Sequence, residues 1–500
     1  MHEPASSRRA LLDTVMRYVE QYLHVDDPAP FYFGLAVAVS AALEGQPLWG
    51  MLVGPPAGGK TEVLKLLGPV ANAALDDVTA PGLLSWSDMS RGRPVGVLMR
   101  IPNPAFVTIS DFSTVLASSQ RGLRDQLFAL LRVVFDGKVT RSLGNADKML
   151  TWEGRVTLLA ACTPAIDNYS SHSDALGPRW VFLRIRARDQ AAQRAVLRKA
   201  RGNTTAGRAK SQALARQLVR LAVARLSSIE LSPEFHDAID NLSLVTCSGR
   251  ATVPRESSWR REIDGVVDKE EPPRVAKQLT ILALCCCAIG LTEHEALSLC
   301  RRVALDSAPA LRGRAVLMLA ELGSFTAAEM ARAVGCSPKT AARVLEDLAF
   351  IGIATQADSS ASRWDAPSDS VAHAKPFTLT HEGQMLRSSL LDDHVLGRAV
   401  DAGQAMDEVL VEHPPPPNRG SSADTNASAV ADTSSTARAG AMSDAADRML
   451  GLLRAVTTAA WYEPPGQPGS SLMLRPTGTG IERWRPPPSR AQPGDGAARD

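Results

Sequence analysis

The stretch from Leu48 to Leu67, LWGMLVGPPAGGKTEVLKLL, constrains the fold of this chain more than any other part of the sequence. It begins with a short apolar run, as expected for a buried parallel strand, and it ends with apolar residues at helical spacing. The pattern G-x-x-x-x-G-K-T lies between the two. A strand, a glycine-rich loop and a helix in this order predict an α/β domain in which the loop binds an anion at the helix N-terminus.

Eight consecutive residues are expected to form the anion site: Gly54, Pro55, Pro56, Ala57, Gly58, Gly59, Lys60 and Thr61. The glycines let the backbone curl so that successive amide N–H groups face a phosphate. Lys60 would reach the β- and γ-phosphates, and the hydroxyl of Thr61 would bind Mg²⁺. A chance glycine-rich turn is the alternative, but the flanking strand and helix favour ATP or GTP with Mg²⁺ as the ligand.

A second apolar run, AFVTISDF at 105–112, ends in an acid and is expected to complete the metal site. Asp111 stands where such a strand presents a carboxylate to Mg²⁺. Two adjacent acids are usual, one for the metal and one to polarise the attacking water, but Ser110 occupies the first position. Asp111 then both binds the metal and polarises the water, or another acid such as Asp136 helps. The alternative is that Asp111 only caps the following helix.

Two later positions suit phosphoryl transfer. The run VTLLAACTP at 156–164 is a buried strand ending in Thr163, which fits a group that hydrogen-bonds the attacking water or the γ-phosphate. In ALGPRWVFLRI at 175–185, Arg179 lies between a turn and a strand. An exposed arginine there would stabilise the charge on a neighbouring subunit's γ-phosphate. A surface arginine held in an ion pair is an equally good interpretation.

The order of these elements resembles the core of AAA+ ATPases. It is most similar to the branch with a β-hairpin before the sensor-1 strand, which includes the minichromosome maintenance helicases and many phage and mobile-element replication ATPases. The resemblance extends over residues 30–300. It implies a Walker A motif, a Walker B acid, a sensor 1 and an arginine finger at Gly54–Thr61, Asp111, Thr163 and Arg179 respectively.

The same resemblance implies a helical lid. The segment EEPPRVAKQL at 270–279 is similar to the family's lid helix, which makes Arg274 the sensor-2 candidate. Ser110 is the clearest departure from the family pattern. It bears on the rate of hydrolysis more than on nucleotide binding.

A basic β-hairpin is expected between the second and third strands. GKVTRSLGNADKMLTWEG at 137–154 alternates across two short strands around a turn at 144–147. Lys138, Arg141 and Lys148 give it positive charge. In the helicases that it resembles, this hairpin enters the pore of a ring and holds DNA phosphates. An ordinary surface hairpin is the alternative.

The stretch from Arg184 to Arg225 holds twelve Lys or Arg residues and a single acid, Asp189. Self-repulsion disfavours such a stretch unless an anion compensates, and phosphate backbones are the common partner. A solvated basic helix face is the alternative.

Residues 310–385 predict three helices followed by two strands. TAAEMARAVG and SPKTAARVLEDLAFIG have helix-turn-helix spacing, with Ser337 as N-cap and Pro338 in the first turn. IATQ and PFTLTHEGQML would form the strands of a wing. This pattern resembles winged-helix domains, with Lys339, Thr340 and Arg343 on the exposed face of the recognition helix. DNA binding is favoured, and protein docking is the alternative.

Composition sets the limits of these predictions. The net charge of +2 assigns any nucleic-acid binding to local basic patches. The seven cysteines show no C-x-x-C pair or zinc spacing, and the longest apolar run, Leu279 to Leu291, is too short to span a bilayer. We therefore expect reduced cysteines, no signal peptide, no membrane partner and a cytoplasmic location.

The predicted fold class is α/β: a P-loop AAA+ parallel-sheet core with an all-helical lid and a winged-helix domain. The boundaries are expected at 1–30 for an N-terminal helical segment, 31–186 for the core, 187–305 for the lid, 306–390 for the winged helix-turn-helix domain and 400–500 for a mostly disordered tail, with one helix at 445–460.

These features together predict an ATPase that works as a homo-oligomeric ring on single-stranded or forked DNA, as a helicase or in replication initiation. A nucleotide-switched DNA-binding regulator with slow turnover is the alternative, because one Walker B acid is missing. A remodeller of proteins would not need the basic hairpin, the arginine-rich stretch and the winged helix together.

Overall fold

The computed structural model describes residues 5–87, 93–117, 121–143, 148–167, 179–256, 261–356, 375–385, 387–390, 474–477 and 480–483. The chain divides into two units, residues 1–460 and 461–500. The described part of the second unit is an antiparallel pair, β13 (Leu474–Thr477) and β14 (Gly480–Arg483). The rest of the tail predicted to be disordered, with the helix expected at 445–460, lies outside the described residues.

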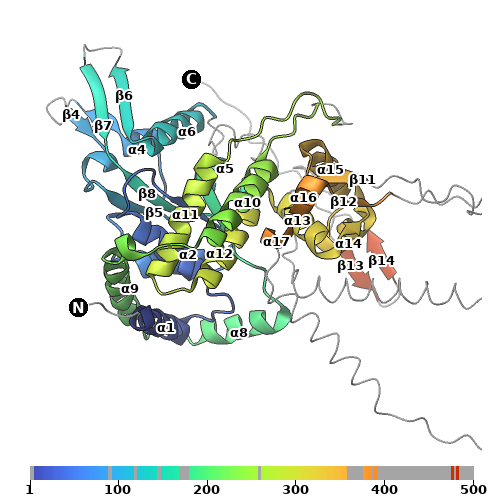
Figure 1. The fold of residues 1–500 in the computed structure, drawn as a ribbon. Coiled ribbons are helices and arrows are strands. Elements are labelled where there is room, and N and C mark those ends of the chain that lie inside the picture. The colour runs from blue at the N-terminus through green and yellow to red at the C-terminus, as the bar shows by residue number, and fades with distance from the viewer. Residues whose placement is uncertain are drawn as a thin grey trace, which may run out of the picture. The chain divides into compact units, whose positions relative to one another are not determined.

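A five-stranded parallel sheet forms the centre of the first unit (Figure 1). Its strand order is β2 (Ala73–Leu75), β5 (Ala105–Ile109), β8 (Val156–Cys162), β1 (Trp49–Val53) and β9 (Trp180–Arg184). Every residue of β1, β5 and β8 is buried. Strands covered on both faces need no polar side, which explains why they appear in the sequence as continuous apolar runs. The prediction of an α/β protein with a parallel sheet is confirmed.

Helices cover both faces of this sheet. On one face lie α2 (Ala29–Ser40) and α3 (Lys60–Leu67), and behind them α1 (Ala5–Tyr22), α9 (Arg208–Val223) and α11 (Pro273–Ala288). On the other face lie α4 (Ala80–Leu83), α5 (Ser113–Ala117) and α6 (Arg121–Phe135). Side chains of β1 alternate between the two cores, since Leu52 belongs to the first and Met51 and Val53 to the second.

Helices dominate the chain after β9. They are α8 (Gln190–Arg201), α9, the short 3-10 helix Leu226–Ser228, α10 (Pro233–Arg250), α11 and α12 (Glu293–Asp306). Residues 251–268, called here the 251–268 segment, join α10 to α11 without helix. Two isolated β-bridges, Thr252 to Asp268 and Arg255 to Ile263, connect its two halves. Residues 257–260 lie outside the described residues.

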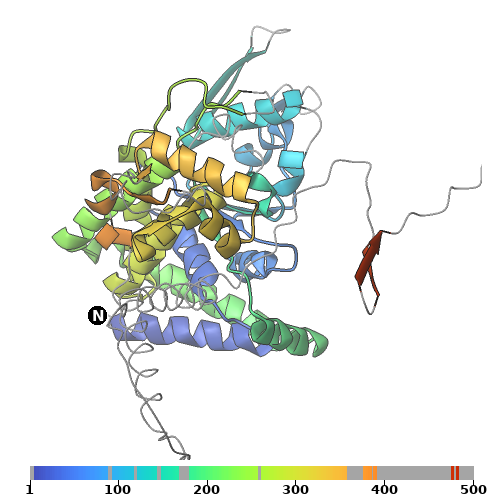
Figure 2. The ribbon, with the colours of Figure 1, turned by 90° about the vertical axis from the view of Figure 1, so that its right-hand side faces the viewer.

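Two hairpins extend from the sheet's second face. Strands β6 (Lys138–Leu143) and β7 (Lys148–Glu153) pair antiparallel where a hairpin was predicted, and its turn at 144–147 lies outside the described residues. The pair stands out from the body in both views (Figure 1 and Figure 2). A second antiparallel pair, β3 (Ser85–Ser87) and β4 (Arg93–Val95), precedes the 3-10 helix Val97–Met99 and was not predicted.

The last described part of the first unit combines helices with a small sheet. α13 (Ala310–Leu322), α14 (Ala327–Val334) and α15 (Pro338–Ile351) surround an antiparallel sheet of order β10 (Ser324–Phe325), β12 (Phe377–Leu379) and β11 (Ala354–Gln356). The short helices α16 (His381–Met385) and α17 (Arg387–Leu390) follow. Ser337 accepts a hydrogen bond from the Thr340 backbone N–H at 3.1 Å, so the predicted N-cap is confirmed. Within the described ranges, no helix is both long and apolar enough to cross a bilayer.

Candidate nucleotide site and nucleic-acid surfaces

The 54–61 loop connects the carboxyl end of β1 to the first turn of α3. Gly54 N–H donates to the Cys162 carbonyl at 3.1 Å, and Gly58 N–H donates to the Pro55 carbonyl at 3.1 Å. Gly59 is the N-cap of α3 and has a φ of 99°, a conformation that a glycine adopts without strain. Because a glycine cap has no side-chain oxygen, the first N–H groups of α3 remain available to an anion.

Lys60 is folded back across its own loop. Its Nζ donates to the carbonyl oxygens of Gly54 at 2.6 Å and Pro55 at 2.8 Å. Burial lowers the pKa of Lys60, although the nearby groups of Cys162 and Asp111 oppose this shift. A poorly solvated ammonium group gains more from a phosphate than an exposed one does, so the loop is poised to accept an anion.

Asp111 and Thr163 lie at the same edge of the sheet as the loop. Strand β8 stands between β1 and β5, so Thr163, which follows β8, lies between the loop and Asp111. Ser113 links the two, because its N–H donates to Asp111 Oδ1 at 2.8 Å and its hydroxyl accepts from Thr163 N–H at 2.9 Å. Asp111 therefore does cap α5, as the alternative interpretation held, while its carboxylate is solvent-exposed and open to a metal.

Arg179 lies at the opposite edge of the sheet, directly before Trp180, which pairs with the first residue of β1. Its Nη2 is 3.2 Å from Asp136 Oδ2, and its guanidinium lies 5.6 Å from the centre of the Phe135 ring. The side chain is 14% exposed, and burial lowers the pKa of Arg179 although Asp136 opposes this. Asp136 is thus bound to Arg179 at the amino edge and does not join Asp111 at the carboxyl edge.

Arg274, at the start of α11, belongs to the same cluster as Arg179. Its Nη1 is 3.4 Å from Glu270 Oε1, and Arg250 Nη1 is 3.6 Å from the other oxygen of Glu270. Arg250 Nη2 in turn donates to the Trp180 carbonyl at 2.6 Å. Burial raises the pKa of Glu270 although the arginines oppose this. The geometry groups Arg274 with Arg179 and separates both from the 54–61 loop.

A pocket opens beside the loop that the sequence did not reveal. Gly58 and Gly59 form one wall, and the apolar side chains of the other walls come from Leu23, Val25, Pro30, Phe31, Val63 and Ile185. Four charged residues, Asp26, Asp27, Arg186 and Arg188, also line it, and Arg188 Nε is 3.1 Å from Asp26 Oδ1. Because residues 23–31 and 185–188 are far apart in the chain, no local pattern could have identified the pocket.

The basic residues of the hairpin differ in their surroundings. Lys138 lies at its base, 3.8 Å from Glu153, and Arg141 pairs across the strands with Leu150. The backbone of Lys148 belongs to β7, and its side chain lies outside the description. Val139, Leu150 and Trp152 are buried and hold the base of the hairpin against the sheet. The strand register places them on the same face as Arg141, whereas Met149, on the face of Lys138, is 64% exposed.

The basic stretch from Arg184 to Arg225 is in part structural. Arg184 binds the Asp167 carboxylate through two hydrogen bonds of 2.8 and 2.7 Å, and Arg208 lies 2.6 Å from Glu62. Helix α8 has no buried residue and carries Arg198, Lys199 and Arg201 in its last turn. The exposed basic residues of the stretch therefore lie on α8 and also on α9, where Lys210, Arg216 and Arg220 are exposed.

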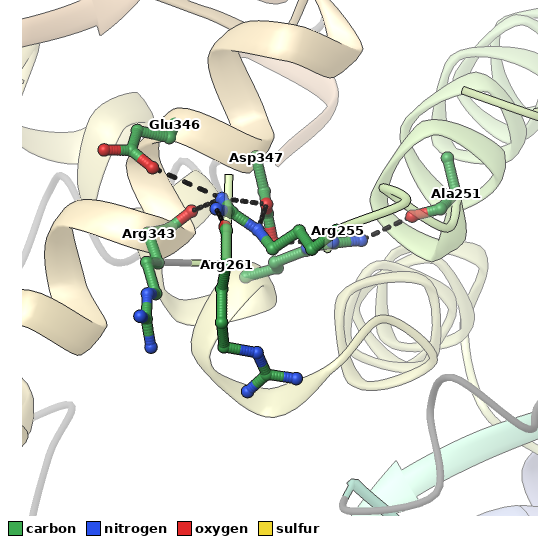
Figure 3. A network of polar contacts seen from close by, with 7 residues as sticks. Ala251, Arg255, Arg261, Arg343, Glu346 and Asp347 are labelled. Carbon is green, nitrogen blue, oxygen red and sulfur yellow. Dashed lines mark hydrogen bonds and ion pairs between the residues drawn. The ribbon is translucent and has the colours of Figure 1, made fainter. Parts of the chain in front are cut away.

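The outer face of α15 is partly covered by the 251–268 segment. Arg255 reaches from that segment to Asp347 Oδ1 at 2.6 Å and to the Arg343 carbonyl at 3.1 Å (Figure 3). Arg312 of α13 binds the other oxygen of Asp347 at 2.7 Å. Of the predicted contact residues, Lys339 is exposed, whereas Thr340 and Arg343 are half-buried.

No protein-family model matches the chain, and no curated protein matches it. The described residues contain no group of three His, Cys, Asp or Glu side chains placed to hold a metal. A Mg²⁺ bound by Thr61 and Asp111 would take its remaining oxygen ligands from phosphates and water, as is usual for this ion.

Proposed function

We propose that this chain is an AAA+ ATPase that acts on DNA. The observation that carries the proposal is the 54–61 loop, which joins a fully buried parallel strand to a helix N-terminus and holds Lys60 at its centre. Thr163 and Asp111 lie at the same sheet edge, where parallel α/β sheets bind their ligands. The apolar walls of the pocket beside the loop suit a nucleobase.

In the proposed reaction, the β- and γ-phosphates bind the N–H groups at the start of α3. Lys60 exchanges the carbonyls of Gly54 and Pro55 for phosphate oxygens. Thr61 and Asp111 would hold a Mg²⁺ ion, which would neutralise charge at the phosphates. Thr163 orients the attacking water. Since Ser110 provides no carboxylate, Asp111 serves both the metal and the water, and we expect slower turnover than with two acids.

Arg179 and Arg274 would act on the nucleotide of a neighbouring protomer. Both lie at the edge of the sheet opposite to their own loop, so each can touch a nucleotide only across an interface. Arg179 would exchange Asp136 for a γ-phosphate oxygen. We propose that an arrangement in which every protomer donates to the next forms a homo-oligomeric ring, which head-to-tail interfaces generate when their rotation closes.

DNA is the proposed substrate because three basic elements occur in one chain. The β6–β7 hairpin projects with Lys138, Arg141 and Lys148, α8 is exposed and basic, and α13 to α15 with the β10–β12–β11 sheet suit a winged-helix domain. The second candidate, a nucleotide-switched DNA-binding regulator, is favoured by one observation: Ser110 stands where a second Walker B acid is usual, so turnover would be slow.

The deciding experiment is ATP hydrolysis by the full chain with and without single-stranded or forked DNA, at low and physiological salt. Stimulation that falls with salt and does not depend on sequence supports a motor. Nucleotide binding with negligible turnover, together with tight binding of one duplex, supports the regulator. Lys60→Ala is the matched variant, and hydrolysis that is unchanged in Lys60→Ala would refute the site itself.

A further inference from the structure

We infer that Arg188 binds the phosphates of the nucleotide held by its own protomer. The inference rests on the proposed nucleotide site and adds a residue that the sequence analysis did not single out. Arg188 follows β9 by four residues, at the carboxyl edge that carries the 54–61 loop. A terminal nitrogen of Arg188, Nη2, lies 3.9 Å from the point where a Cβ on Gly59 would stand. The guanidinium is therefore beside the first turn of α3.

The ion pair with Asp26 aims Arg188 at the loop. Asp26 engages Nε at 3.1 Å, which fixes the plane of the guanidinium, while Nη2 points to the Gly59 side of the pocket. The side chain of Arg188 is 18% exposed, so little rotamer freedom remains to be lost on binding. Gln193 Nε2 also donates to the Arg188 carbonyl at 3.1 Å, which ties the backbone here to the start of α8.

Charge compensation gives Arg188 a second role. Asp26 and Asp27 both line the pocket, and their carboxylates would repel an incoming phosphate. Asp27 is paired with Arg302, whose Nη1 is 2.7 Å away, and Asp26 is paired with Arg188. Loss of Arg188 would remove a phosphate ligand and also leave the Asp26 charge uncompensated near the anion. By contrast, Arg179 and Arg274 cannot replace it, because they lie at the other edge of the sheet.

The test is equilibrium binding of ATP, ADP and adenosine to the full chain, measured by displacement of a fluorescent ATP analogue. Arg188→Ala should weaken ATP and ADP about 10- to 100-fold, the range for one charge-assisted hydrogen bond, and leave adenosine unchanged. The double variant with Asp26→Asn should recover part of the loss, since it removes the unpaired carboxylate. Arg188→Lys should lose less affinity for ATP than Arg188→Ala. Arg17→Ala, at an exposed position of α1, should bind ATP as wild type does.

Each contrary result has a distinct meaning. Arg188→Ala that binds ATP within twofold of wild type, while Lys60→Ala does not bind, overturns the inference and leaves the proposed site intact. Equal weakening of adenosine and ATP assigns Arg188 to the base and overturns its role at the phosphates. A wild-type chain that binds no ATP overturns the proposed function and this inference together.

Discussion

Lys60 and Arg179 lie at opposite edges of the same parallel sheet. Lys60 follows β1 beyond Val53, which pairs with Arg184, whereas Arg179 precedes Trp180, which pairs with Trp49. Four residues of extended strand separate the two pairs, a span of roughly 13 Å at about 3.3 Å per residue. A single protomer cannot bring both cations to one phosphate, so their roles can be separated by mutation.

Arg179→Ala should leave ATP binding unchanged and reduce turnover about 10³-fold or more, the effect expected for an arginine that stabilises phosphoryl transfer across an interface. Mixing this variant with Lys60→Ala in equal amounts should restore some hydrolysis, because a Lys60→Ala protomer can supply Arg179 to a neighbour with an intact loop. Full activity of Arg179→Ala alone would show that the Asp136 ion pair is its whole role. The measurement is steady-state phosphate release at increasing protein concentration.

Asp111→Asn separates helix capping from metal binding. Asparagine caps helices about as well as aspartate, so the hydrogen bond from Ser113 N–H should persist and thermal stability should stay close to wild type. The lost charge should weaken Mg²⁺ binding and abolish most hydrolysis. Asp111→Ala serves as the comparison, because it loses both functions. Normal Mg²⁺-dependent hydrolysis by Asp111→Asn would leave Asp111 with capping as its only role.

Asp347→Ala should destabilise the first unit by about 3 kcal/mol. The carboxylate is 15% exposed and receives Arg255 and Arg312 on its two oxygens, and removal of one partner leaves buried charges unpaired. Glu346→Ala is the matched control. Glu346 is 53% exposed and 3.4 Å from Arg255, so its removal should lower the free energy of unfolding by less than about 1 kcal/mol. Denaturant unfolding of both variants makes the comparison, and equal effects would contradict this account.

Glu321→Gln should make stability less dependent on pH. Burial raises the pKa of Glu321 above its usual value of 4.5. Its stabilising contribution is therefore complete below 4.5 and is lost as the pH rises through the folded-state pKa, because the unfolded chain then holds fewer protons. Glutamine resembles the protonated acid, so the variant should melt higher than wild type at pH 8 and about equally at pH 4. A constant difference in Tm across this range would refute the assignment.

Local signals in the sequence were sufficient for the elements that depend on neighbouring residues. The strand before the 54–61 loop, the β6–β7 pairing and the Ser337 cap were each predicted within one short window, where burial, strand alternation or capping chemistry acts directly. The β3–β4 pair was not predicted from the sequence, because three-residue strands have too few positions to show an alternating pattern.

The positions of arginines were beyond such reasoning. Arg179, Arg188 and Arg274 all lie near sequence features that suit a phosphate, yet only Arg188 is beside the protomer's own loop. Which edge a guanidinium reaches depends on partners distant in sequence, Asp136 for Arg179 and Asp26 for Arg188. Such pairings are set by the packing of the helices on the sheet. The residues next to each arginine in the sequence therefore do not indicate its ion-pair partner.

Gly54 has a second constraint besides the curl of its loop. A Cβ at this position would stand 2.9 Å from the Cβ of Ile185, the residue that follows β9, the strand next to β1. Even a descendant of this protein that no longer bound any nucleotide would meet this steric limit, because alanine at position 54 would force two neighbouring strands apart. Retention of Gly54 among divergent relatives would therefore indicate only that the packing of the sheet is retained. Retention of Lys60 would indicate that nucleotide binding is retained.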